Sequence, residues 1–270
     1  MSKMAGISPS GRADLAAILG AGRRFVTPAS VVDALGVDPR TAAKKLSRWA
    51  AEGWLRRARR GLYIPVPVDA ANPAAWSEDA LIVAAAVWSP CYFTGWTSAS
   101  HWALTDQVFR TTVLKTSGRV RASSVRLLDR DYLVTHVSPA AMEWGLKTEW
   151  RGEVRLRIAD PARTVIDAMD APRLAGGIRH GAEILAAFLE DHDPRVLIDY
   201  GDRLGNRAVF KRLGYILEAI GSDRKNLAEA CLRRVSAGIS LLDPDGPPRG
   251  RTVTRWGIRI NAPVGAEEPA

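Results

Sequence analysis

The apolar and polar positions near the N-terminus predict three helices followed by a β-hairpin. The helical patterns cover residues 14–19, 28–36 and 39–53, and a glycine lies at the end of each. Thr27-Pro28 and Asp38-Pro39 each combine an N-cap residue with a following proline, which is typical of a helix start. Only residues 36–38 separate the second and third helices, and so tight a turn predicts a helix-turn-helix.

Residues 54–64 run in the order apolar, basic, apolar, which predicts two short strands around a cationic tip. The strands are Trp54-Leu55 and Leu62-Tyr63-Ile64, and the tip is Arg56-Arg57-Ala58-Arg59-Arg60-Gly61. A surface hairpin without a partner is the plainer interpretation. Four arginines without an acid repel one another unless they meet an anion, and this favours the wing of a winged helix.

The third predicted helix has an apolar side and a basic side. Helical periodicity predicts that Ala43, Leu46 and Trp49 are buried. Val32, Leu35 and Tyr63 are expected to be structural as well, holding this helix to the wing. The opposite side carries Arg40, Thr41, Lys44, Lys45, Ser47 and Arg48. These are the residue types that reach phosphates and guanine edges in a major groove.

The charge of the chain is concentrated in this same segment. The 270 residues include 38 basic and 29 acidic ones, which gives a net charge of +9 and a pI near 10.0. Residues 39–61 contain eight of the basic residues and one acid, Glu52. A solvated helix face is the alternative, but such faces mix charges of both signs. The predicted DNA contacts are therefore Arg40, Thr41, Lys44, Lys45 and Arg48 on the helix, with Arg57, Arg59 and Arg60 on the wing.

The rest of the chain mixes strands and helices without βαβ alternation, which predicts an α+β fold. Strands are expected at residues 91–94, 108–115, 125–128, 132–137, 154–158 and 253–260, and helices at 76–88, 97–104, 161–169 and within 177–236. Thr97 or Ser98 is expected to cap the second of these helices. Asp69 to Pro73 reads as a linker. The domain organisation is thus a winged helix-turn-helix over residues 1–70 and a larger mixed α+β domain over residues 71–270.

The sequence offers no catalytic set and no cofactor or metal motif. It has no phosphate-binding GxxxxGK[ST], dinucleotide GxGxxG, HExxH or GxSxG pattern. The two cysteines, Cys91 and Cys231, are expected to be reduced and buried, and the four histidines lack metal-ligand spacing. The nearest enzyme-like pattern is Glu153-Val154-Arg155, close to the Glu-x-Lys of metal-dependent nucleases, but arginine has no proton to exchange. We therefore expect no enzymatic activity, metal or cofactor.

The longest apolar run, Ala80 to Trp88, is too short to span a bilayer, so no membrane association is expected. The first ten residues lack the apolar core of a secretory signal. Both observations predict a cytoplasmic protein.

Five strings in this chain resemble the AbiEi family, the antitoxin half of bacterial abortive-infection toxin–antitoxin pairs. The N-terminal string is LGVDPRTAAKKLSRWAAEGWL (residues 35–55) followed by RRGLYIP (59–65). The later strings are FTGWTSASHWAL (93–104), IADPARTVIDAM (158–169), RLGYILEAIG (212–221) and RWGIRIN (255–261). They follow one another in the family's order, and the resemblance extends over most of the chain. The wing is unusually rich in arginine for this family.

The resemblance implies a transcriptional repressor that binds inverted repeats in double-stranded DNA upstream of its own operon. It also implies that the C-terminal domain neutralises a nucleotidyltransferase-type toxin encoded next door, by direct contact or otherwise. The chain is not that toxin, because it lacks a Gly-Ser motif followed by paired aspartates. Two other classes stay open: a stand-alone regulator that responds to a small ligand, and a metal-dependent nuclease built around Glu153.

Overall fold

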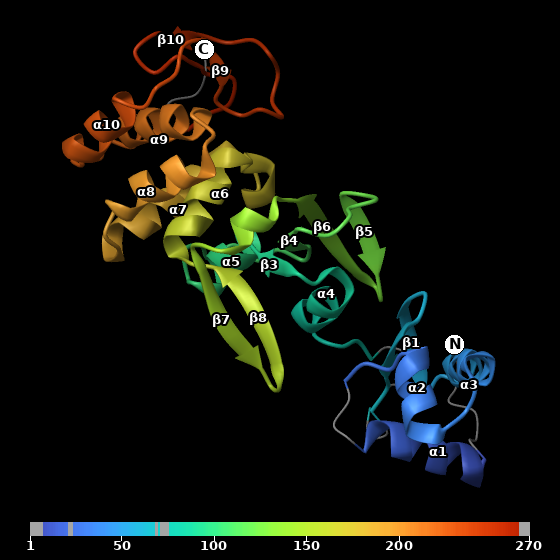
Figure 1. The fold of residues 1–270 in the computed structure, drawn as a ribbon. Helices are drawn as coiled ribbons and strands as arrows, with labels where there is room; N and C mark the ends of the chain where they lie inside the picture. The colour runs from blue at the N-terminus through green and yellow to red at the C-terminus, as the bar shows by residue number, and fades with distance from the viewer. Residues whose placement is uncertain (1–7, 21–23, 68–69, 71–75, 265–270) are drawn as a thin grey trace. The chain divides into compact units, whose positions relative to one another are not determined.

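The computed structural model describes residues 8–20, 24–67, 70 and 76–264, and it is an α+β protein as predicted (Figure 1). The chain divides into two compact units. The first unit contains residues 1–89 and 126–131, and the second contains residues 90–125 and 132–270. The predicted linker, Asp69 to Pro73, lies outside the described residues except for Ala70. The functional boundary between residues 70 and 71 stays a prediction.

The first unit has the predicted order of three helices and a hairpin. Its elements are α1 (Pro9–Leu19), α2 (Pro28–Leu35), α3 (Pro39–Ala51), β1 (Leu55–Arg59), β2 (Leu62–Pro65) and α4 (Ala80–Trp88). Helix α1 begins before the predicted Asp14, because Ser8 accepts a hydrogen bond from the Gly11 amide and Pro9 stands in the first turn. Helix α4 begins after the predicted Trp76, because Asp79 caps it.

The turn between α2 and α3 is defined by its caps. Thr27 and Ser30 form a reciprocal capping box at the start of α2. Gly36 ends that helix with φ of 62°, a conformation that favours glycine. Asp38 then accepts hydrogen bonds from the amides of Arg40 and Thr41 and starts α3. These local interactions fix the helix-turn-helix that the sequence predicts.

The second unit is built around a mixed sheet and a group of helices. Its strands are β3 (Cys91–Phe93), β4 (Thr112–Thr116), β5 (Ser124–Leu127), β6 (Arg130–His136), β7 (Leu146–Arg151), β8 (Val154–Ala159), β9 (Ser240–Leu241), β10 (Thr252–Val253) and β11 (Ile258–Arg259). Its helices are α5 (Gly95–His101), α6 (Pro161–Asp170), α7 (Ile178–Asp191), α8 (Val196–Leu204), α9 (Ala208–Ala219) and α10 (Lys225–Leu232), with short 3-10 turns at Pro139–Met142 and Pro172–Ala175. Residues 126–131, at the tip of the β5–β6 hairpin, belong to the first unit.

The larger sheet has the strand order β5-β6-β4-β3-β8-β7, and a smaller one has the order β10-β11-β9. Strands β3/β8 and β4/β6 pair in parallel, whereas β3/β4 and β7/β8 pair antiparallel. The sequence predicted a strand at residues 154–158, which is β8, but none at residues 146–151, so β7 was missed. The turn itself lies at Gly152, where φ is 60°.

Helix α5 corrects another expectation, since it starts at Gly95 and is capped by neither Thr97 nor Ser98. Gly95 has φ of 57°, and a Cβ there would lie 1.9 Å from the Leu174 carbonyl oxygen. Ser98 is buried inside the helix and donates to the Gly95 carbonyl. The close approach of a neighbouring backbone, which no local pattern reveals, sets the start of this helix.

Candidate nucleic-acid interface

Helix α3 is held by an apolar core in the first unit. Ala42, Leu46 and Trp49 are fully buried. The prediction that Ala43 belongs to this stripe is wrong, because Ala43 is exposed. At 3.6 residues per turn, Ala43 lies about 120° around the helix from Trp49, whereas Ala42 lies only about 20° from it. The basic residues of α3 therefore face away from the core. The buried stripe differs from the predicted one in that Ala42 takes the place of Ala43.

The hairpin is fixed to the helices by main-chain pairing. Val26 and Tyr63 exchange two backbone hydrogen bonds of 2.8 and 2.9 Å, which form an isolated antiparallel β-bridge beside β2. Tyr63 is buried in the same core, and Val32 and Leu35 pack against it half-buried, as predicted. The hairpin and α3 are thus parts of one packed body.

Two of the predicted contact residues on α3 are engaged within the protein. The Thr41 hydroxyl donates to the Asp38 carboxylate at 2.6 Å. The Thr41 hydroxyl and amide hydrogen bonds lower the pKa of Asp38 below its usual value. The Lys45 ammonium lies 2.6 Å from the Asp14 carboxylate of α1 and also over the ring of Trp49. Thr41 and Lys45 thus lie at the edge of the exposed face and help to anchor the helix.

The middle of the exposed face is a row formed by Arg40, Lys44 and Ser47, one helical turn apart. Arg40 and Lys44 are exposed, and no carboxylate of the described residues lies within 4 Å of either. Arg48 flanks the row and makes a long, exposed ion pair with Glu52 at 3.6 Å. Ser47 stood on the predicted basic face but was not among the predicted contacts. The helical spacing of four and then three residues could have identified it.

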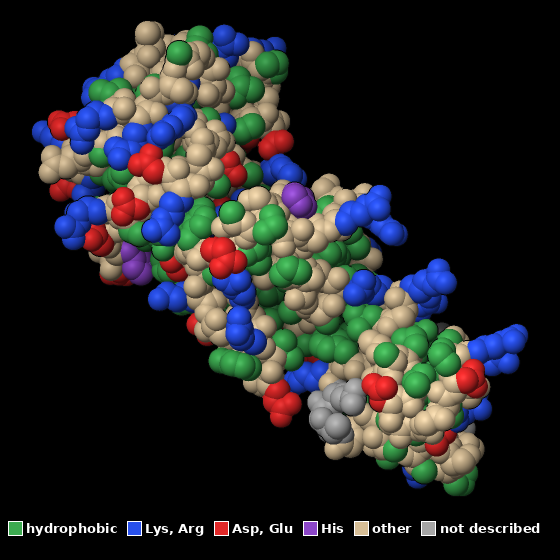
Figure 2. Space-filling model, in the orientation of Figure 1, with side chains coloured by type: hydrophobic (Ala, Val, Ile, Leu, Met, Phe, Trp, Pro, Cys, Tyr) green, Lys and Arg blue, Asp and Glu red, His purple; other side chains and the backbone are tan. Residues whose placement is uncertain are grey.

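The wing presents three predicted arginines to solvent. Strand β1 has a bulge between Arg57 and Arg59, so Ala58 is an extra residue opposite β2. The bulge breaks the inward–outward alternation, with Ala58 buried and both arginines exposed. Arg60 is exposed too, and the turn continues through Gly61 with φ of 76°. Figure 2 shows long basic side chains projecting from the first unit.

Arg56 differs from its three neighbours in being half-buried. Its guanidinium donates to the Trp76 carbonyl at 2.6 Å and to the Asp129 carboxylate at 2.7 Å, all within the first unit. The Arg56 hydrogen bond and charge lower the pKa of Asp129. Arg56 is therefore a structural residue, in agreement with its omission from the predicted contacts.

The second unit contains a buried ionic cluster. The Asp167 carboxylate accepts hydrogen bonds from Thr94 at 2.6 Å, Lys115 at 3.0 Å, Arg163 at 3.1 Å and Tyr92 at 3.1 Å. All five side chains are buried. Burial raises the pKa of Asp167, but the charges of Lys115 and Arg163 together with the hydrogen bonds from Thr94 and Lys115 outweigh it, so the pKa lies below its usual value. The aspartate is ionised and serves as the counterion of two cations.

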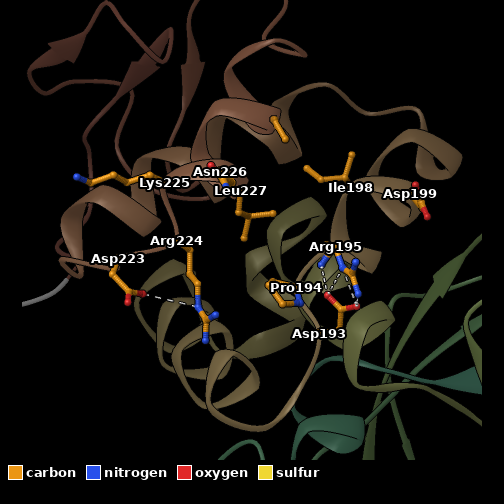
Figure 3. Close-up of a pocket in the computed structure, with 11 residues that line it drawn as sticks. Asp193, Pro194, Arg195, Ile198, Asp199, Asp223, Arg224, Lys225, Asn226 and Leu227 are labelled. Carbon is orange, nitrogen blue, oxygen red and sulfur yellow. Dashed lines mark hydrogen bonds and ion pairs between the residues drawn. The ribbon is translucent and has the colours of Figure 1, made fainter.

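A half-open pocket of about 690 Å³ lies between α8 and α10 (Figure 3). Pro194, Ile198, Leu227 and Ala230 give it an apolar lining, and charged residues surround them. Arg195 is bound to its neighbour Asp193 at 2.7 Å, with the pKa of Asp193 lowered to about 2 by that hydrogen bond. The pocket therefore combines apolar surface with charged residues, among which Arg195 pairs with Asp193 and Arg224 with Asp223.

The structure gives no support to the nuclease interpretation. Glu153 is exposed in the two-residue turn of the β7–β8 hairpin. Within the described ranges, no group of three or more His, Cys, Asp or Glu could hold a metal ion. In the same part of the chain, no helix is long and apolar enough to cross a membrane.

Three packed helices, a helix-turn-helix and a hairpin with an arginine-rich tip define a winged helix-turn-helix regulator. Residues 13–66 match the family model described as "Transcriptional regulator, AbiEi antitoxin". The match covers the winged-helix segment, and it confirms the AbiEi resemblance for the N-terminal string of the sequence.

The crystal structure of the Rv2827c protein from Mycobacterium tuberculosis is similar to the chain as a whole. The TM-score is 0.65 at 14% sequence identity, and the match covers 95% of this chain and 93% of that chain. At this identity the similarity shows a shared fold. No curated protein sequence matches this chain.

Proposed function

We propose that this protein is the antitoxin and transcriptional autorepressor of a bacterial toxin–antitoxin operon. In this proposal, residues 1–70 bind inverted repeats in double-stranded DNA, and residues 71–270 neutralise a nucleotidyltransferase-type toxin. A repressor of its own operon acts in the cytoplasm, and the proposal assigns no catalytic step or cofactor to this chain. The observation that carries the DNA-binding part is the row of Arg40, Lys44 and Ser47 beside an arginine-rich wing.

The contact residues divide into two proposed roles. Arg40, Lys44 and Ser47 occupy the middle of the exposed face of α3 and are placed to read base edges, with arginine suited to guanine. Arg48 and the wing residues Arg57, Arg59 and Arg60 lie around them and are placed to bind phosphates. Thr41 and Lys45 support the helix and make weaker contacts, because each already has a partner.

The salt dependence of binding tests this assignment. The four cations assigned to phosphates, Arg48, Arg57, Arg59 and Arg60, predict a slope of about −4 for log affinity against log salt, or a loss of about 150-fold between 50 and 200 mM. A mobility-shift titration with the chain's own upstream DNA measures the slope. Replacing Arg59 and Arg60 by alanine should reduce it by about two. The matched control replaces Arg249 and Arg251, two exposed arginines of the second unit, and should leave it unchanged.

The adjacent lysines of α3 give a sharper comparison. Lys44→Ala removes an exposed charge that has no carboxylate partner among the described residues, so it should weaken DNA binding clearly. Lys45→Ala removes the partner of Asp14, so it should lower the melting temperature and weaken DNA binding less. A flat salt titration, or a larger loss of DNA affinity for Lys45→Ala than for Lys44→Ala, would contradict the proposed interface.

The toxin part needs its own test. The protein should relieve growth arrest caused by a nucleotidyltransferase encoded next to it, and the wing variant with Arg59 and Arg60 replaced should keep this relief while losing repression. Absence of such a neighbouring gene would favour a solitary regulator.

The pocket between α8 and α10 favours one second candidate, a regulator that responds to a small ligand. A half-open pocket of about 690 Å³ has the size of many small-molecule sites. A ligand of this kind should raise the melting temperature, and Leu227→Arg should abolish that increase. If no metabolite in a screen raises the melting temperature, the ligand-responsive regulator is contradicted and the antitoxin proposal remains.

A further inference from the structure

Strand β7 is the outer strand of the larger sheet, so one of its edges has no neighbouring strand in the described residues. The ladder with β8 shows which residues face outward. The Gly145 carbonyl accepts from the Asp160 amide, so the main-chain groups of residue 145 point toward β8. Since these groups alternate along a strand, the N–H and C=O groups of Leu146, Thr148 and Trp150 point away from β8. The free edge offers three donor–acceptor pairs.

Four side chains of this strand are also exposed, those of Lys147, Thr148, Trp150 and Arg151, whereas Glu149 is half-buried and Leu146 packs half-buried beside Met142 and Ala159. Trp150 is 63% exposed, which makes it one of three large hydrophobic residues that the described part of the chain leaves open to solvent. Leu146, Thr148 and Trp150 share one face of the strand, and Lys147 and Glu149 lie on the other. Figure 2 shows apolar, basic and acidic side chains close together over this hairpin. An edge strand with such a side chain is a template for pairing unless something covers it.

We propose that β7 pairs antiparallel with β7 of a second copy of this chain, about a two-fold axis at Thr148. The two Thr148 residues then lie opposite each other and exchange both main-chain hydrogen bonds. Leu146 lies opposite the partner's Trp150, which covers the exposed indole. Lys147 lies opposite the partner's Glu149, and symmetry produces this ion pair twice. Threonine pairs and opposite charges are favourable across antiparallel strands.

Other registers fit less well. An axis at Lys147 or at Glu149 places two like charges opposite each other, which is unfavourable. An axis at Trp150 uses only the end of the strand before the turn at Gly152. A two-fold axis between two residues would place a residue whose N–H and C=O point outward opposite one whose N–H and C=O point toward β8. Such a pair cannot exchange hydrogen bonds, so this register is excluded. The register at Thr148 keeps the longest overlap and the best match of charges.

Self-complementarity is the reason to assign this edge to a second copy. One strand of six residues supplies both halves of each ion pair and both members of the apolar contact. A symmetric pair of chains also suits a DNA site made of two inverted half-sites. The pairing stands on the geometry of β7 and does not depend on the proposed function.

Sedimentation velocity over a range of protein concentrations tests the pairing in the full chain. We expect a monomer–dimer equilibrium that Thr148→Pro abolishes. Proline removes an outward N–H that takes no part in the β7–β8 ladder, so the variant should keep its melting temperature. Thr148→Val keeps that N–H and is the matched control.

A charge exchange tests the register. Lys147→Glu and Glu149→Lys each turn two ion pairs into two repulsive pairs, so each should raise the dissociation constant of the dimer about tenfold or more. A mixture of the two variants restores opposite charges at both positions and should dimerise again. A chain that is monomeric at every concentration would overturn the proposal, as would a dimer that Thr148→Pro leaves intact. Failure of the mixture to recover would overturn the register.

DNA provides a separate readout. Thr148→Pro should keep its affinity for a single half-site and lose cooperative binding to the inverted repeat. If the wild-type chain does not bind a half-site, the proposed function is contradicted and the pairing is not. If Thr148→Pro binds the inverted repeat as cooperatively as the wild type does, the pairing is contradicted and the proposed function is not.

Discussion

Asp167 gives the sharpest test of how the second unit is stabilised. Its carboxylate is fully buried and receives four hydrogen bonds, two of them from the cations Lys115 and Arg163. The Arg163 guanidinium also lies 3.3 Å from the centroid of the Trp144 ring. Asp167→Asn keeps the size of the side chain and removes its charge. Arg163 then loses the carboxylate with which it pairs, and Lys115 keeps only Asp170 at 3.8 Å.

The expected loss follows from this geometry. Removing one partner of a buried ion pair costs about 3 to 5 kcal/mol, because it leaves an uncompensated charge away from water. For a domain of this size, each kcal/mol lowers the melting temperature by about 2 to 4 °C, so we expect a decrease of about 6 to 20 °C. Lys115→Met is the matched comparison. It leaves the pair of Asp167 and Arg163 intact and should cost less.

The pH dependence gives an independent check. The pKa of Asp167 lies below its usual value in the folded protein, so its stabilising effect is complete above the unfolded pKa of about 3.9. That effect disappears as the pH falls through the lower folded pKa. The difference in stability between wild type and Asp167→Asn should therefore stay constant from pH 5 to 8 and shrink only in more acidic solution.

Thermal and urea unfolding of the wild type and the two variants measure these differences. A change of less than about 1 kcal/mol for Asp167→Asn would refute the argument, since the lower limit for a broken buried pair is about 3 kcal/mol. A larger loss for Lys115→Met than for Asp167→Asn would also refute it, because the aspartate would then not be the shared counterion.

Three further predictions concern stability and domain organisation. Trp49→Ala should cost about 3 to 5 kcal/mol and unfold the first unit, and a variant that kept its melting temperature but lost DNA binding would instead make Trp49 a contact residue. Burial raises the pKa of the Cys91 and Cys231 thiols to about 12, so a thiol reagent at pH 8 should label them only after urea unfolding, and rapid labelling of the native protein would contradict their burial. A fragment of residues 71–270 should fold cooperatively and relieve toxin-induced arrest, and a folded fragment without protection would place neutralisation in the first unit.

The first unit could be predicted well because local interactions define it. Thr27, Asp38 and the prolines that follow them fix where α2 and α3 begin, and both signals can be read directly from the sequence. The basic residues were also placed on the correct helix and hairpin. What the sequence could not reveal is which of them already have partners. Lys45 binds Asp14 across 31 positions, and only the packing of α1 against α3 brings the two together.

The second unit shows where local patterns stop being informative. Strand β7 was missed because its residues Leu146–Arg151 alternate only weakly, and an exposed edge strand does not need an apolar face. Helix α5 begins where it does because Gly95 approaches the Leu174 carbonyl. Both features depend on contacts between distant segments. The candidate pocket between α8 and α10 is of the same kind, since residues 193–199 and 223–230 meet only in the folded chain.

The family-like strings of the second unit also acquire a physical explanation. Thr94 from FTGWTSASHWAL and Arg163 and Asp167 from IADPARTVIDAM meet in the buried cluster. Arg212 of RLGYILEAIG donates to the Met169 and Leu242 carbonyls, and Trp256 of RWGIRIN packs where a Cβ on Gly214 would lie 2.1 Å from its ring. These signature residues therefore hold the fold together. Because these particular residues are buried, their substitution will report on stability, and a test of the proposed antitoxin function should begin with exposed residues that differ between relatives of the same fold.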